Sequence, residues 1–95
     1  MFVRFTYLYF QADRRQEAIS IYNSEIAPVI RRQKGNKQVS LLEAPDGSEF
    51  ISYSLWEEEA DVKAFEKSDE YLPVIARIKE LVSQPPVQKY YHVND

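Results

Sequence analysis

The hydrophobic pattern opens with a nine-residue run, 2–10, that carries bulky side chains at both odd and even positions. Successive side chains of a strand point to opposite faces of its sheet, so this pattern predicts a strand covered on both faces. From residue 18 the apolar positions recur every three or four residues, which is typical of an amphipathic helix. We expect this helix to be capped at Asp13, disturbed at Pro28 and ended by Gly35.

The rest of the pattern completes a β-α-β-β-α-β order. The remaining predicted elements are two hairpin strands (39–44 and 50–56), a helix in two pieces (57–67, and from a Ser68–Asp69 cap to Pro85) and a last strand (87–93). This order is typical of the ferredoxin-like α+β fold, an antiparallel sheet with helices on one face. Residues 1–95 are expected to form one such domain.

The strands are apolar on both faces, whereas the helices can cover only one face of the sheet. We therefore expect a second copy of the chain to cover the other face, so that two sheets pack together in a homodimer. A homodimer is the main partner that the pattern predicts.

The composition of the chain argues against several other kinds of partner. The net charge is −3 with interspersed signs, which argues against nucleic acid because phosphate binding needs clustered Lys and Arg. The chain has no cysteine and one histidine, and no metal-ligand spacing is present, so no metal site is expected. The apolar start is too short to span a membrane and lacks a signal-peptide pattern. A cytoplasmic protein without a membrane partner is expected.

One segment resembles a known family. Its motif reads Ser54-x-Trp56-Glu57-x-Glu59-Ala60-Asp61, then Ala64-Phe65, then Ser68-Asp69. It is similar to the antibiotic biosynthesis monooxygenase (ABM) family, whose members pair as dimeric α/β barrels. That family includes cofactor-free enzymes that oxidise polycyclic phenols to quinones, haem-degrading enzymes and proteins without an assigned reaction. The resemblance therefore implies the dimeric α/β barrel and leaves the activity open.

The resemblance also implies candidate site residues. Trp56 matches a pocket-lining Trp of the quinone-forming members, and Ser52 stands where they carry an assisting Asn; these two are the candidate catalytic residues. The haem-degrading members carry a Trp and a His ligand at positions matched here by Phe65 and Ile75. Isoleucine cannot bind iron, so the resemblance implies no haem, and no other cofactor is expected.

The strand pattern supplies a reason for a pocket near Trp56. Ser52 and Ser54 alternate with the large Phe50 and Trp56 on one strand face, and small residues between aromatics leave room for an aromatic ligand. The opposing interpretation is that Trp56 is a core anchor and the serines bond locally. The candidate ligand-binding residues are Ser54, Phe65, Tyr71 and Tyr7.

The functional hypothesis is a homodimeric, cofactor-independent monooxygenase, or a binder of a small aromatic molecule of the phenol or quinone type. Whether the chain is an enzyme stays open at this stage. One alternative is a non-enzymatic ligand-binding or sensor module of the same fold. Another is a small-metabolite isomerase, which would depend on His92 or a tyrosine.

Overall fold

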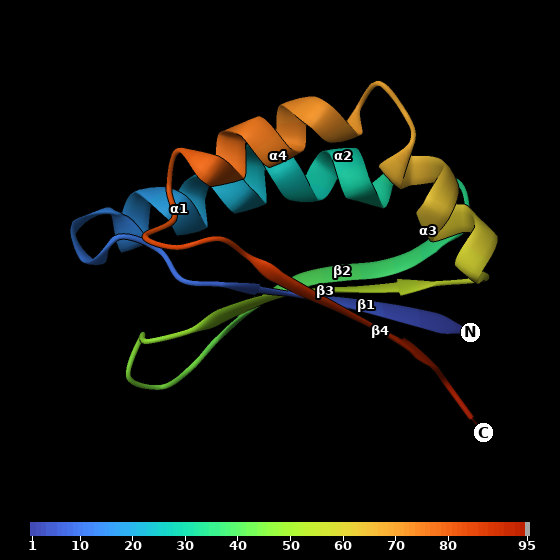
Figure 1. Cartoon of the computed structure of the whole chain (residues 1–95), viewed down its shortest axis with the longest axis horizontal. Helices are drawn as coiled ribbons and strands as arrows, with labels where there is room; N and C mark the ends of the chain where they lie inside the picture. Colours follow the sequence, from blue (N-terminus) through green and yellow to red (C-terminus); the bar gives the residue numbers. More distant parts are fainter. Residues whose placement is uncertain (95) are drawn as a thin grey trace.

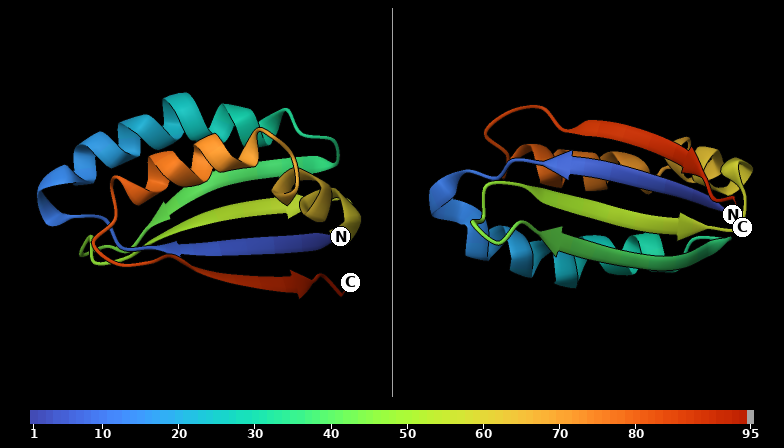
Figure 2. Two further views of the ribbon diagram at one scale, coloured as in Figure 1. Left: turned by 45° about the horizontal axis from the view of Figure 1, so that its top comes forward. Right: turned by 90° about the horizontal axis from the view of Figure 1, so that it is seen from below.

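The computed structural model describes residues 1–94 and contains one antiparallel sheet with every helix on the same side of it (Figure 1). The strands are β1 (Phe2–Leu8), β2 (Asn36–Glu43), β3 (Phe50–Trp56) and β4 (Val87–His92), and they lie in the order β2-β3-β1-β4. Figure 2 shows the opposite side of the sheet, which no helix covers. The predicted ferredoxin-like α+β fold is confirmed.

The first helical region contains a π-helical turn. It comprises η1 (Ala12–Arg14), α1 (Arg15–Ile21), the π turn η2 (Tyr22–Ile26) and α2 (Ala27–Arg31). Pro28 has no N–H to donate and its ring crowds the carbonyl four residues earlier, so the wider turn accommodates it. The predicted cap at Asp13 is wrong, because Asp13 lies inside η1 and no side chain caps α1.

The second helical region is divided into α3 (Glu59–Glu66) and α4 (Tyr71–Lys79). A capping box of Glu58 and Asp61 starts α3. The predicted cap at Ser68–Asp69 is wrong: the Ser68 hydroxyl donates to the Phe65 carbonyl (2.7 Å) at the end of α3, and no side chain caps α4. In the described part of the chain, no helix is long and apolar enough to cross a membrane.

The layer between sheet and helices is apolar at its ends and polar in its middle. The pairing register sets Arg4 beside Ser54 and Thr6 beside Ser52, and all four of these side chains are buried. The buried apolar and aromatic residues that surround them include Phe2, Leu8, Tyr22, Ile26, Phe50, Trp56, Val62, Phe65, Val74 and Leu81. This polar middle determines where a site can form.

The uncovered face of the sheet is also apolar and aromatic. The Phe5 ring lies 5.7 Å from the Tyr53 ring and 5.7 Å from the Tyr91 ring, measured between centroids. Leu42 and Tyr91 remain 44% and 48% exposed on this face. Both faces of the sheet therefore carry apolar residues, as the sequence predicted. We call the face that no helix covers the open face.

Candidate functional site

Five of the six candidate residues lie on the helix-facing side of the sheet. Ser52, Ser54 and Trp56 alternate along β3 with their side chains buried beneath the helices. Phe65 of α3 stacks on Trp56 with 5.9 Å between ring centroids, and Tyr71 of α4 meets Phe65 edge-on at 5.2 Å. The structure thus joins Trp56, Phe65 and Tyr71 into one row of aromatic rings.

The sixth candidate, Tyr7, lies on the open face, where the Lys89 ammonium group is 5.3 Å from its ring centre. The two candidate catalytic residues are both enclosed by the fold. Trp56 is 0% exposed, and its Nε1 has no hydrogen-bond partner among the described residues. The Ser52 and Tyr22 hydroxyls lie 2.5 Å apart, and burial raises the pKa of Tyr22, which stays neutral. Ligand contact with either candidate thus requires a neighbouring side chain to move.

A cavity of about 290 Å³ lies between α4 and the part of the sheet made by β1 and β4. We call it the Arg4 cavity. Its apolar wall comes from α4, and its polar floor comes from the two strands. Such a combination orients a small ligand, and the volume is near the lower limit of ligand pockets, roughly 300–1,000 Å³. The lining residues are Arg4, Thr6, Tyr71, Val74, Ile75, Ile78, Lys79, Pro86 and Gln88.

Arg4 is the central polar group of this cavity, and its side chain is only 6% exposed. Its Nη1 donates to Glu66 Oε2 (3.2 Å), and its Nε donates to Thr6 Oγ1 (3.3 Å). The Tyr71 ring lies 5.3 Å from the guanidinium carbon, within cation–π range. Sequence analysis did not select Arg4, although a charged residue within an apolar strand run was the available signal.

A second group of hydrogen bonds fixes the polar floor. Gln88 Nε2 donates to the Tyr71 hydroxyl (3.0 Å), while Gln88 Oε1 lies 2.9 Å from the Tyr90 hydroxyl. The Tyr90 hydroxyl also lies 2.7 Å from Glu66 Oε2. Burial and the neighbouring Glu66 carboxylate raise the pKa of Tyr90, so this hydroxyl stays protonated and donates. This hydroxyl has a single proton, which can go to only one of the two oxygens at a time, so the Gln88 amide is held by its own donation to Tyr71.

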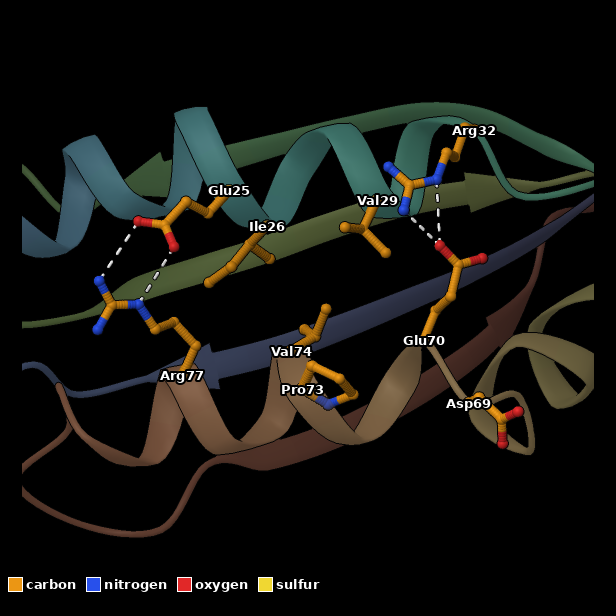
Figure 3. Close-up of a pocket in the computed structure, with 9 residues that line it drawn as sticks. All are labelled: Glu25, Ile26, Val29, Arg32, Asp69, Glu70, Pro73, Val74 and Arg77. Carbon is orange, nitrogen blue, oxygen red and sulfur yellow. Dashed lines mark hydrogen bonds and ion pairs between the residues drawn. The ribbon is translucent and has the colours of Figure 1, made fainter.

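A larger cleft of about 470 Å³ lies between α4 and the helical segments η2 and α2 (Figure 3). Two ion pairs bridge it: Arg77 with Glu25, and Arg32 with Glu70. Each cation in the cleft is paired with a carboxylate, so the cleft has little unpaired charge with which to bind a ligand. Val74 lines both the cleft and the Arg4 cavity, and so separates them.

Other chemistry is sparse in the described part of the chain. Residues 1–94 hold no group of three or more His, Asp or Glu side chains placed to hold a metal ion. His92, considered for isomerase chemistry, is 71% exposed, and its Nε2 lies 3.8 Å from a Glu59 carboxylate oxygen. The Arg4 cavity is therefore the candidate site.

The fold and its cavity define a class: ferredoxin-like α+β proteins that hold a small cavity between the sheet and a covering helix. The chain belongs to the antibiotic biosynthesis monooxygenase family, whose family model matches residues 1–77. The predicted family is confirmed. No curated protein matches the sequence.

Solved structures from several organisms share the fold. Candidate antibiotic biosynthesis monooxygenases from Nitrosomonas europaea (20% identity, 98% of each chain, TM-score 0.83) and Deinococcus radiodurans (14% identity, 100% of this chain and 94% of that one, TM-score 0.87) are similar. So is a monooxygenase from the ActVA-Orf6 gene of Streptomyces coelicolor, solved in complex with nanaomycin D (16% identity, 99% and 88%, TM-score 0.85). At these identities the likeness establishes the fold alone.

Proposed function

We propose that the chain is a homodimer that binds a small aromatic molecule in the Arg4 cavity and oxidises it without a cofactor. The observation that carries the proposal is this cavity, with an apolar α4 wall and a floor of buried polar groups. A flat apolar ring fits the wall, and an oxygen substituent fits the hydrogen-bonding floor. The monooxygenase bound to nanaomycin D shares the fold and supports an aromatic ligand.

The proposed reaction is the oxidation of a phenol to a quinone by molecular oxygen. The substrate supplies the electrons: one oxygen atom enters the ring opposite the hydroxyl, and the other leaves as water. The protein would contribute orientation, exclusion of water and hydrogen bonds to the substrate oxygen. In this proposal Trp56 and Ser52 keep the catalytic roles implied by the family resemblance, and a movement of Phe65 or Tyr22 would expose them.

Oxygen uptake with a panel of polycyclic phenols and hydroquinones tests the enzymatic part. We expect turnover by the wild type and a marked loss in Trp56→Phe, because the smaller ring loosens the packing of Phe65, which in turn contacts Tyr71 in the lining of the Arg4 cavity. A fluorescence-independent binding assay with the matching quinones controls for lost binding. Tight quinone binding without oxygen uptake in the wild type would contradict the monooxygenase and leave a binding protein.

The contact between Ser52 and Tyr22 favours a second candidate function. The Ser52 hydroxyl is engaged by a neighbour instead of facing the Arg4 cavity. A non-enzymatic binding or sensor module needs only the cavity and not this hydroxyl. Under this alternative Ser52→Ala leaves ligand affinity unchanged, and the wild type consumes no oxygen.

The homodimer in the proposal is supported by the open face. Phe5, Tyr53 and Tyr91 form an aromatic cluster on this face, which lies opposite all the helices (Figure 2). Large exposed apolar patches commonly mark interfaces, and two such sheets can pack face to face. The Arg4 cavity lies on the other side of the sheet, so each subunit would keep its own site. Sedimentation equilibrium at micromolar concentration should give twice the subunit mass.

A further inference from the structure

We infer that the ligand of the Arg4 cavity is an anion, specifically a small aromatic carboxylic acid whose carboxylate contacts Arg4. The inference rests on the proposed function, because it assumes that the cavity binds an aromatic molecule. It names the charge of that molecule and the residue that selects it.

The charge of the lining is the first observation. Although the chain has a net charge of −3, the nine residues that line the cavity include two cations, Arg4 and Lys79, and no Asp or Glu. The nearest carboxylate, Glu66, lies outside the lining, pairs with one Arg4 nitrogen and also accepts from Tyr90. Because Glu66 occupies only Nη1 and Thr6 only Nε, the guanidinium group keeps donor capacity toward the cavity, and Lys79 adds a second positive charge to the lining.

The direction of the hydrogen bonds is the second observation. Thr6 Oγ1 already accepts from Arg4 Nε, and the Tyr71 hydroxyl already accepts from Gln88, so each hydroxyl has its own proton left to donate. Arg4 Nη2 makes no hydrogen bond to any residue in the described part of the chain. The floor therefore offers three donors: Arg4 Nη2, the Thr6 hydroxyl and the Tyr71 hydroxyl.

A carboxylate matches this set of donors. It has two oxygens that only accept, and it pairs well with the planar guanidinium group of an arginine. A phenol oxygen can accept from one of these donors, but its own proton finds no acceptor among them. The set therefore favours a phenolic substrate that also carries a carboxylate, and the carboxylate is the group that contacts Arg4. The α4 wall of Val74, Ile75 and Ile78 accommodates the ring, and the volume of about 290 Å³ suits one or two rings.

Calorimetry at pH 7 with 1-naphthoate, 1-naphthamide and 1-naphthol tests the inference, since these probes share one ring system. We expect naphthoate to bind at least about ten times more tightly than the other two, because hydrogen bonds to charged groups are the stronger ones. Equal affinity for naphthoate and naphthamide would overturn the anion inference. Preferred binding of naphthol would overturn the anion inference and leave the uncharged phenol of the proposed function.

The double variant Arg4→Gln/Glu66→Gln tests the named residue while leaving no buried charge unpaired. We expect about 10- to 100-fold weaker naphthoate binding and unchanged naphthamide binding. Circular dichroism controls for folding. In Arg4→Lys, which keeps the charge but loses the planar fork, affinity should be intermediate. Wild-type naphthoate affinity in the double variant would overturn the role of Arg4.

A second pair of variants separates failure of this inference from failure of the proposed function. Ile75→Trp fills the Arg4 cavity, whereas Leu72→Trp adds the same ring at a 73% exposed position of α4. We expect the first variant to abolish aromatic binding and the second to preserve it. If both bind every probe as the wild type does, the cavity is not the site and both proposals fail. If only the charge preference is absent, the proposed function stands without the anion.

Discussion

At the scale of single residues, Arg4, Thr6, Ser52 and Ser54 beneath the helices are each held by a specific partner. Ser54 donates to the Arg4 carbonyl (3.5 Å), Arg4 pairs with Glu66, and Ser52 is bonded to Tyr22. A buried polar group without a partner costs about 1–3 kcal/mol, so these contacts are needed for the sheet to carry polar residues there.

The Tyr22–Ser52 contact gives the first stability prediction. In Tyr22→Phe the buried Ser52 hydroxyl loses its partner, and we expect the free energy of unfolding to fall by about 1–3 kcal/mol. Adding Ser52→Ala removes the unpaired group, so the double variant should be less destabilised than the sum of the two single variants by about 1 kcal/mol. Urea unfolding at one fixed protein concentration measures all four proteins. Additive losses would contradict an energetic coupling between the hydroxyls.

The residue scale also separates what the sequence predicted from what it could not. Alternation along β1 and β3 correctly brought Ser52, Ser54 and Trp56 to one face, because a strand has a fixed period of two. The same rule could not pair Arg4 with Glu66, which lies 62 positions further along the chain. That contact depends on where α3 packs over the sheet. The Arg4 cavity was missed for this reason.

At the scale of elements, turns and helix ends were the least predictable parts. The apolar stripe predicted one helix up to Gly35, yet the regular helix ends at Arg31 and a π turn precedes Pro28. The apolar residues still line one side of this helical region, because the π turn rotates the helix surface slightly without breaking the helix. Similarly, serine is a common residue at the start of a helix, but the Ser68 hydroxyl donates to the Phe65 carbonyl at the end of α3 and does not cap α4. Side-chain caps compete locally, and the pattern alone does not rank the competitors.

Gly35 joins the first helical region to β2 and gives a prediction at this scale. It has a φ of +83°, and a Cβ there would collide with the Asp61 carboxylate, which accepts from the Glu58 N–H in the capping box of α3. Gly47 has a similar φ of +73°, but its added Cβ would meet only the flexible end of Arg15. The two glycines therefore form a matched pair.

We expect Gly47→Ala to cost about 1–2 kcal/mol from backbone strain alone. Gly35→Ala carries the same strain and also displaces Asp61, so its total loss should be nearer 3 kcal/mol. Chemical unfolding of both variants at equal protein concentration measures the difference. Equal losses would mean that Asp61 moves aside at no cost and that the contact between α3 and this turn is unimportant for stability.

The ion pair between α2 and α4 gives a prediction about pH. Hydrogen bonds from Gln33 and then Arg32 lower the pKa of Glu70 from its usual 4.5. A carboxylate with a lowered folded-state pKa stabilises the fold above its unfolded pKa, and this contribution is lost as the pH falls through the folded value. We expect the wild type to exceed Glu70→Gln in melting temperature at pH 7, with the gap closing below about pH 4.5. A gap that is constant from pH 7 to pH 3 would contradict this role of the pair.

At the scale of the whole molecule, the two faces of the sheet have different roles. The helix-facing side encloses the Arg4 cavity, and the open face leaves aromatic rings such as Tyr53 and Tyr91 without a covering layer. If a second subunit supplies that layer, the stability of the fold includes the free energy of association. The melting temperature should then rise with protein concentration.

Tyr53 lies near the centre of the open face, on β3 opposite Phe5 of β1 and Ser40 of β2. A carboxylate placed there would be buried between two subunits without a partner, so Tyr53→Glu should convert a dimer into a monomer. Leu72→Glu is the matched control, because it introduces the same charge at an exposed apolar position of α4, on the helix side. Sedimentation equilibrium at about 10 μM should give a dimer for wild type and Leu72→Glu and a monomer for Tyr53→Glu. The melting temperature of Tyr53→Glu should also lose its dependence on concentration. A monomeric wild type would contradict the dimer outright, and a dimeric Tyr53→Glu would move the interface away from this face.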